Sequence, residues 1–343
     1  MRRQHDPPRR AGARHAGLVV AAVMLVLVLA ATSLCVGALT TSPAQTLHIL
    51  TDGFSATPTA DEVAVLHYRV PRTIVIIVVG VALGLAGALI QGHTRNPLAD
   101  PGLLGISAGA AAAIVIGIYF FSADDAFTML VLAFAGSAVA TSAVFLIGGG
   151  RRRGSDPVGL VLAGAAIAAL LTAVTTTIVL RSPEALDAFR FWTAGSVAVS
   201  EGRSYLPALI PLAVGAALAA ASGPGLNLLA MGHEAAGSLG LNVPRLRVVG
   251  LCAITLLAGA ATAVAGPLAF LGLIAPHLAR GLVGADYRAV LPVAGLCATG
   301  ILLVADIAGR VISEREVPAG VMLVLVGVPF FLVVIRRTRF QSA

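Results

Sequence analysis

The sequence predicts an all-α integral membrane protein with about ten transmembrane helices, on the basis of its composition and its hydrophobic pattern. Of the 343 residues, 58% are hydrophobic and 11% are charged. A soluble domain carries about 25% charged residues, so lipid must cover most of a surface with so little charge. The apolar residues also gather into runs close to the ~20 residues that a helix needs to cross a bilayer.

The first apolar run, residues 17–39, follows a basic tail formed by residues 1–16. The run exceeds the ~7–15-residue core of a signal peptide, so we expect it to be retained as the first span. Residues 17–343 are then expected to form one transmembrane domain. The other predicted spans are residues 70–90, 103–121, 127–147, 158–180, 205–221, 248–268, 272–283, 290–309 and 318–335. The short span at 272–283 is expected to begin earlier, near Pro267.

The distribution of arginine predicts how these spans are oriented. An even number of spans places both termini on one side of the membrane. Roughly sixteen of the 23 basic residues fall on that side, and the loops of the other side are acidic. The positive-inside rule therefore places both termini in the cytoplasm of a bacterial cell, with the chain in the cytoplasmic membrane. The net charge of +7 follows from this topology and does not indicate nucleic-acid binding.

Several kinds of chemistry are disfavoured by the sequence. It contains no lysine, and a P-loop needs lysine to reach nucleotide phosphates, so we do not expect this chain to hydrolyse ATP. The cysteines, Cys35, Cys252 and Cys297, lie in apolar runs without the spacing of a zinc site. Ser107 and His277 would suit an intramembrane serine protease, but the glycines around Ser107 are more typical of helix packing. We predict no catalytic residue, no metal site and no bound cofactor.

A short internal repeat predicts an inverted-repeat-like arrangement. Residues 96–106 contain the pattern Asn-Pro-Leu-Ala followed by Gly-Leu-Leu-Gly-Ile, and residues 266–274 contain Gly-Pro-Leu-Ala followed by Leu-Gly-Leu-Ile. The helices that precede the two copies run in opposite directions in the predicted topology. Inverted repeats are characteristic of transporters.

The longest hydrophilic segment on the predicted cytoplasmic side, apart from the tail, is residues 222–247. Pro224 and Pro244 are expected to bound short helices within it. Three apolar residues there would face the cytoplasm: Leu228, Leu229 and Met231. They fit either a protein-binding surface or a connector that packs against the ends of the helices.

The predicted outer side carries Arg69 and Arg72 at the start of the second span. These residues fit either headgroup anchors or a site that recognises carboxylates, for which the guanidinium is well shaped. Arg310 follows Asp306 by four residues, which predicts an ion pair on one helix face. We find no paired carboxylates within the spans, which argues against a self-sufficient, ion-coupled secondary carrier.

Five stretches of the sequence together resemble one known family. They are residues 69–72 (Arg-Val-Pro-Arg), 87–105 with the run Asn-Pro-Leu-Ala-Asp-Pro-Gly, 232–240, 266–277, and 305–318. They are similar to the permease family of type II ABC importers, which take up ferric siderophores, haem and cobalamin. The resemblance covers nearly the whole chain after the first span.

The resemblance implies roles for particular residues. Arg69, Arg72 and Arg310 match positions that dock an extracytoplasmic substrate-binding protein. The segment 222–247 would hold the coupling helix for the ATPase, at Gly232, His233, Glu234, Ala235, Leu239 and Gly240. The loop before the fifth span matches the cytoplasmic gate, at Asp156, Pro157 and Val158. His233 departs from the family pattern, which usually has an acid there.

The resemblance also implies an assembly and a cargo. Two permease subunits, identical or paralogous, would pack with two ATPase subunits that use ATP and Mg²⁺, and a binding protein would deliver the substrate. The lipid bilayer would surround the permeases, and no nucleic acid is expected. A ferric siderophore is the first expectation for the cargo, with haem or cobalamin as alternatives; a secondary carrier is the rival from another class.

Overall fold

The structure is a computed structural model that describes residues 8–37, 40–55, 57–148, 157–198, 205–313 and 316–339. Over these ranges the chain is helical and contains no strand, which confirms the predicted fold class. Seven helices are long and apolar enough to cross a membrane, and three shorter apolar helices accompany them. Together they correspond to the spans that the sequence predicts.

The apolar helices, long and short, are α1 (Pro8–Cys35), α4 (Val70–Thr94), α5 (Ile106–Phe121), α6 (Ala126–Gly148), α7 (Pro157–Val179), α9 (Leu206–Ala230), α11 (Val243–Ala265), α12 (Leu271–Val283), α13 (Tyr287–Ile312) and α14 (Ala319–Arg339). Short elements connect them: α2 (Pro43–Asp52), α3 (Ala60–Glu62), a π-helical turn (Val63–Arg69), a 3₁₀ turn (Pro101–Leu104), α8 (Pro183–Thr193) and α10 (His233–Ser238).

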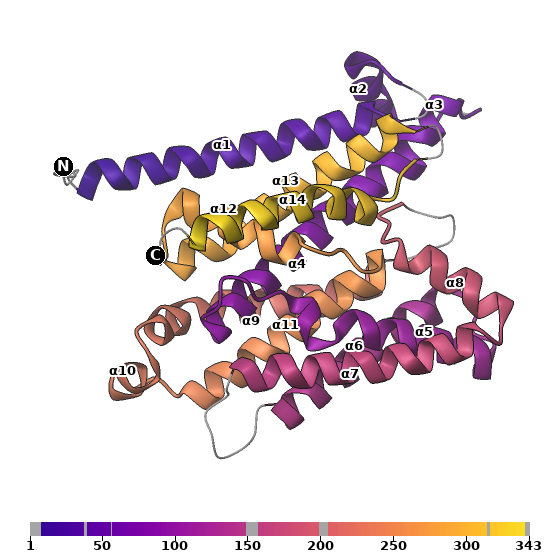
Figure 1. The fold of residues 1–343 in the computed structure, drawn as a ribbon. Helices are drawn as coiled ribbons and strands as arrows, with labels where there is room; N and C mark the ends of the chain where they lie inside the picture. The colour runs from indigo at the N-terminus through magenta and orange to yellow at the C-terminus, as the bar shows by residue number, and fades with distance from the viewer. Residues whose placement is uncertain are drawn as a thin grey trace.

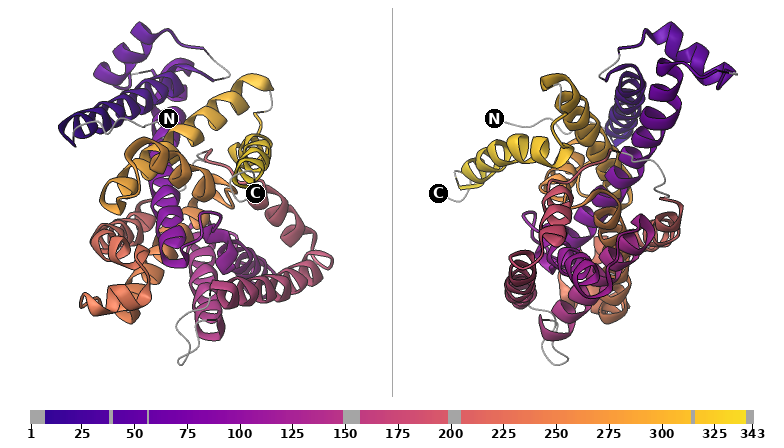
Figure 2. Two further views of the ribbon diagram at one scale, coloured as in Figure 1. Left: turned by 60° about the vertical axis from the view of Figure 1, so that its left-hand side comes forward. Right: turned by 90° about the vertical axis from the view of Figure 1, so that its right-hand side faces the viewer.

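The short elements separate to opposite ends of the helical bundle. Figure 1 shows α10 and both chain termini at one end, and α2, α3 and α8 at the other. We call these the inner end and the outer end, after the predicted topology. α4 and α13 form the centre, where α11 and α12 also pack against α4. The views in Figures 1 and 2 place α1 and α7 on opposite edges of the bundle.

Glycine allows the closest helix contacts. Gly109 of α5 and Gly136 of α6 face each other so closely that a Cβ on either would overlap the backbone carbonyl of the other. Gly87 of α4 meets the carbonyl of Gly272 in the same way. Small residues at such crossings bring helix backbones together, which is how membrane helices gain packing contacts.

Helix ends differ from the prediction at several places, including the start of α1 at Pro8, within the predicted tail, and two differences bear on the site. α12 begins at Leu271 and not near Pro267, because residues 266–270 are not helical and Phe270 has a φ of 65°. α9 continues through Pro224 to Ala230, so Pro224 does not bound a short helix. The buried residues Leu226 and Leu229 hold this last part of α9 against the core. The segment between α9 and α11 is therefore residues 231–242, shorter than the predicted 222–247.

Candidate functional site

The outer end holds a buried cluster of arginines around one carboxylate. Arg72 Nη2 and Nε lie 2.7 Å and 3.0 Å from Asp306 Oδ1, and Arg72 Nη1 lies 2.6 Å from Glu316 Oε2. Arg310 pairs with the other oxygen of Asp306, which confirms the predicted ion pair on α13. The Asp306 side chain is fully buried, whereas Glu316 is partly exposed.

Arg69 and Arg310 are directed at the end of α1. Arg69 Nη1 donates to the carbonyls of Leu34 and Cys35, each at 3.0 Å. Arg310 Nη1 donates to the carbonyls of Ser33 and Val36, at 2.9 Å and 2.8 Å. The last carbonyls of a helix lack donors within it, and a cation there interacts favourably with the helix dipole.

These contacts bear on the predicted docking residues. Arg69 is 6% exposed and Arg310 is 7% exposed, so their guanidinium groups face the protein interior. The contacts assign both residues to holding α1 in place, and neither presents its charge at the surface. Arg72 and its partner Glu316 are the members of the cluster that reach towards the surface.

The inner end presents a short helix with exposed apolar flanks. α10 is bounded by Gly232, with a φ of 110°, and by a turn at Gly240, with a φ of 84°. Both angles favour glycine. Glu234 is exposed and Ala235 is half-buried, while Met231 and Leu239 on either side are 66% and 59% exposed. Leu229 is buried, so of the three apolar residues predicted to face the cytoplasm, Met231 is the exposed one.

Positive charge collects beside α10. The imidazole of His233 contacts the guanidinium of Arg247 on α11, and Arg95 lies near both. Partial burial lowers the pKa of His233 below its usual value, and the charges of Arg247 and Arg95 lower it further. Among the described residues, neither Arg247 nor Arg95 forms an ion pair. This side of α10 therefore offers unneutralised positive charge.

Two polar residues that the sequence analysis missed connect the helices behind α10. Asn227 Nδ2 donates to Asp286 Oδ1 at 2.6 Å, and the backbone N–H of Tyr287 donates to Asn227 Oδ1 at 2.8 Å. These bonds join the end of α9 to the start of α13. The hydrogen bond from Asn227 is the main cause that lowers the pKa of Asp286. An amide within an apolar run was the signal available in the sequence.

Gln91 joins the two copies of the internal repeat. Its Nε2 donates to the carbonyl of Ala99 at 3.2 Å and to those of Gly272 and Leu273 at 3.3 Å. Its Oε1 accepts from Arg280. The side chain is 2% exposed, so these bonds satisfy a buried amide. These bonds thus join the non-helical Ala99 of the first copy to the first turn of α12 in the second copy, next to the points where both helices are interrupted, a feature common in transporters.

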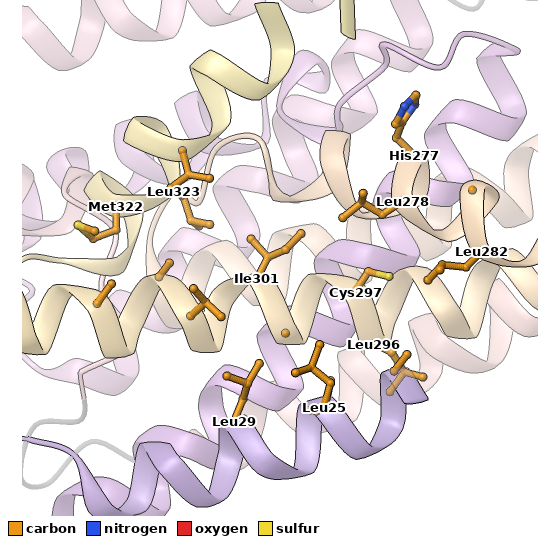
Figure 3. Close-up of a pocket in the computed structure, with 18 residues that line it drawn as sticks. Leu25, Leu29, His277, Leu278, Leu282, Leu296, Cys297, Ile301, Met322 and Leu323 are labelled. Carbon is orange, nitrogen blue, oxygen red and sulfur yellow. The ribbon is translucent and has the colours of Figure 1, made fainter. Parts of the chain in front are cut away.

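Two further predictions from the sequence concern the cytoplasmic gate and the serine protease alternative. Asp156 and the side chains of Pro157 and Val158, predicted for the gate, lie outside the described residues; Pro157 begins α7. Ser107 and His277 line different cavities, and Figure 3 shows His277 in the cavity between α1 and α12–α14. This separation argues against a protease dyad, which needs a hydrogen-bonded pair.

The bundle, its interrupted helices and its exposed inner helix define the transmembrane subunit of a transporter. The chain belongs to the FecCD transport family, whose model matches residues 24–337.

Individual relatives agree with the family. The ferric enterobactin transport system permease protein FepD of Escherichia coli K12 is 44% identical over 322 residues, covering 93% of this chain and 95% of that protein. The iron(3+)-hydroxamate import system permease protein FhuB of Bacillus subtilis 168 is 38% identical, and the match covers 83% of this chain and 75% of that protein. The cobalamin import system permease protein BtuC of Halobacterium salinarum is 35% identical, and the match covers 83% of this chain and 76% of that protein.

The fold also matches a solved structure. A metal-chelate type ABC transporter in an inward-facing conformation superposes with a TM-score of 0.80 at 25% identity, covering 94% of this chain and 99% of that one.

Proposed function

We propose that this chain is the permease subunit of a bacterial ABC importer that carries a ferric siderophore across the cytoplasmic membrane. The observation that carries the proposal is α10, a short exposed helix with apolar flanks at the inner end of a FecCD-family bundle. The names of the relatives support an iron chelate as cargo, because FepD and FhuB are permeases for iron complexes. The relative named for cobalamin supports that molecule as the alternative.

The inner end supports contact with a separate ATPase that uses ATP and Mg²⁺. Met231 and Leu239 would insert into an apolar cleft, because burying two large exposed side chains favours association. The charge on Arg247 and Arg95 would attract an acidic side chain of the ATPase, whereas an acid in place of His233 would repel it. The residues of the predicted coupling segment, Gly232 to Gly240, keep this role in the proposal.

Movement of α10 would reach the rest of the bundle through hydrogen bonds. Asn227 would transmit it from α9 to α13, through its bonds to Asp286 and Tyr287. α13 packs closely against α4, where Gln91 holds the two interrupted segments together. Alternating access would follow from rearrangement of these helices relative to a second permease subunit. The gate remains assigned to Asp156, Pro157 and Val158.

The outer end would receive the binding protein. Arg72 is the residue of the buried cluster best placed for this contact, since its partner Glu316 is partly exposed. A glutamate of the binding protein would compete with Glu316 for Arg72. Arg69 and Arg310 would support this surface indirectly, by fixing α1. This arrangement requires both termini to be cytoplasmic, as the loop charges predict.

The test is co-purification followed by uptake. The tagged chain is expressed with its neighbouring genes, and we expect a stoichiometric P-loop ATPase to remain bound after detergent extraction. Reconstituted with that ATPase and the binding protein, it should take up a ferric siderophore only when ATP is present. A chain that purifies alone and transports without ATP would refute the proposal in favour of a secondary carrier.

Two variants locate the coupling surface. Leu239→Glu should release the ATPase, because a charge replaces an exposed apolar contact. Leu50→Glu, a matched change at an exposed leucine of α2 at the outer end, should leave the ATPase bound. Glu234→Arg should leave the rate of ATP hydrolysis unchanged but abolish uptake. Normal uptake by both inner-end variants would remove α10 from the coupling surface.

A further inference from the structure

A small cavity lies within the bundle, where the two copies of the internal repeat meet. Its volume is about 120 Å³, and Leu83, near the middle of α4, lines one side. The first copy contributes Asp100 and Pro101, and the second contributes residues 267–269. The cavity can hold an ion with a few waters, but it is far smaller than the ~300–1,000 Å³ of a site for a small organic molecule. The cargo of the proposed importer therefore cannot occupy it.

Asp100 brings a carboxylate to this cavity without a cationic partner. Its Oδ1 accepts a hydrogen bond from the N–H of Gly102 at 2.8 Å. Its Oδ2 lies beside the first turn of α12, where a Cβ on Gly272 would be 3.3 Å from it, and the positive end of that helix dipole stabilises negative charge. Among the described residues, no arginine or histidine forms an ion pair with Asp100. Burial at this depth disfavours an unbalanced charge, and a bound cation would offset that cost.

Two hydroxyl groups without hydrogen bonds line the same cavity. Thr262 of α11 is 5% exposed, and Ser107 of α5 is half-buried. Within the described ranges neither hydroxyl forms a hydrogen bond, whereas Thr255, earlier in α11, donates to the carbonyl of Leu251. Both hydroxyls and the carboxylate keep accessible surface, so an ion in the cavity can reach them. A hydroxyl buried as deeply as that of Thr262 normally has a partner, which indicates that the cavity has a polar occupant.

These oxygen atoms select the kind of occupant. Transition metals favour imidazole, thiolate or several carboxylates, and over the described part of the chain no three His, Cys, Asp or Glu side chains are grouped to hold a metal ion. Ca²⁺ and Mg²⁺ carry two charges, of which a single carboxylate balances one. Water alone would bond the hydroxyls but would leave the carboxylate without a counter-charge. A monovalent alkali cation matches the single charge and accepts carboxylate and hydroxyl oxygen as ligands.

We propose that this cavity binds one alkali cation through Asp100, Ser107 and Thr262. The three residues come from the interrupted segment of the first copy, from α5 and from α11, so the ion joins parts of the chain that meet at the repeat junction. The ion balances the carboxylate and stays in place, and it is not carried with the cargo. The sequence predicts no metal site because Asp100 and Thr262 are far apart along the chain.

The first test measures binding of the ion directly. The full-length chain is purified in detergent and equilibrated in choline chloride with radioactive Na⁺, or with radioactive Rb⁺ in place of K⁺. We expect saturable retention of one ion per chain, which excess unlabelled NaCl or KCl displaces and excess choline chloride does not. No saturable retention of either ion would overturn the proposal and leave the cavity to water alone.

Substitutions then locate the site. Asp100→Asn keeps an acceptor for the N–H of Gly102 but removes the charge, and we expect it to abolish retention of the ion. Thr262→Val keeps the shape of the side chain but removes the hydroxyl, which should raise the half-saturating concentration about tenfold. The controls are Thr255→Val, at a hydroxyl bonded within α11, and Asp187→Asn, at an exposed carboxylate of α8, and both should bind the ion normally. Unchanged binding by Asp100→Asn would overturn the proposal.

Thermal unfolding separates loss of the ion from loss of the fold. Saturating NaCl or KCl should raise the melting temperature of the unmodified chain by about 2–4 °C over choline chloride at equal ionic strength. The shift should vanish in Asp100→Asn and persist in Asp187→Asn; an equal shift in Asp100→Asn would contradict the site. If Asp100→Asn does not fold, the titration of Thr262→Val decides, and an affinity equal to that of the unmodified chain overturns the proposal. None of these measurements involves ATP or cargo, so they are independent of the proposed function.

Discussion

Arg72 of α4 and Asp306 of α13 form an ion pair at the outer end of the bundle, with Nη2 and Oδ1 2.7 Å apart. The second oxygen of the same carboxylate pairs with Arg310, whose guanidinium also binds the carbonyls at the end of α1. One buried carboxylate therefore connects three helices. Because the side chain of Asp306 is fully buried, its charge depends on both arginines for stabilisation.

We expect Asp306→Asn to destabilise the protein strongly. The change leaves two arginines without their shared carboxylate in a buried position, and breaking a buried pair costs about 3–5 kcal/mol. Thermal unfolding of the purified protein in detergent measures the effect. Glu316→Gln is the control, since Glu316 is partly exposed and its loss should cost about 0–1 kcal/mol. Equal losses of thermal stability in the two variants would show that the burial of Asp306 does not determine the size of the effect.

The same Glu316→Gln variant tests docking at the outer end. If Arg72 receives a glutamate of the binding protein, removing its internal competitor should tighten docking several-fold, since an exposed ion pair is worth about 0.2–1 kcal/mol. The dissociation constant of the binding protein from the reconstituted permease reports this change. Glu184→Gln removes the same charge from exposed α8 and should have no effect. Weaker docking of the Glu316 variant would make Glu316, and not Arg72, the contact residue.

The fold was largely predictable because each span is marked by its own apolar run, which requires no knowledge of its neighbours. The roles of Arg69 and Arg310 were not, because the carbonyls they bind belong to α1, distant in sequence. The same holds for Gln91, whose partners are residues 99, 272 and 273. Pro224 was misinterpreted because a local rule about proline gave way to the packing of Leu226 and Leu229.

We expect Gly109→Ala to destabilise the contact between α5 and α6. The new Cβ would meet the backbone of Gly136, which cannot move aside as a side chain could, and overpacking of this kind costs about 1–3 kcal/mol. Gly300→Ala is the matched control in α13, because the nearest atom to its Cβ would be a Val26 side-chain carbon at 3.7 Å. Thermal unfolding should show a lower melting temperature for Gly109→Ala and an unchanged one for Gly300→Ala. Similar melting temperatures for both would contradict the close crossing of α5 and α6.

We expect His233 to stay neutral at pH values where an ordinary histidine begins to charge. Burial, Arg247 and Arg95 all lower its pKa, so the folded chain binds fewer protons at this residue than the unfolded chain does. The contribution of His233 to the free energy of unfolding therefore declines as the pH falls below about 6.5.

Hydrogen–deuterium exchange at the imidazole carbon, followed by mass spectrometry, gives the pKa of His233 in the intact protein. Arg247→Gln should raise this pKa, but not fully to its usual value, because burial is the larger cause. Arg181→Gln, the same change at an exposed arginine of the outer end, should leave it unaltered. A pKa of His233 that does not respond to Arg247→Gln would mean that the arginine charge does not reach the imidazole.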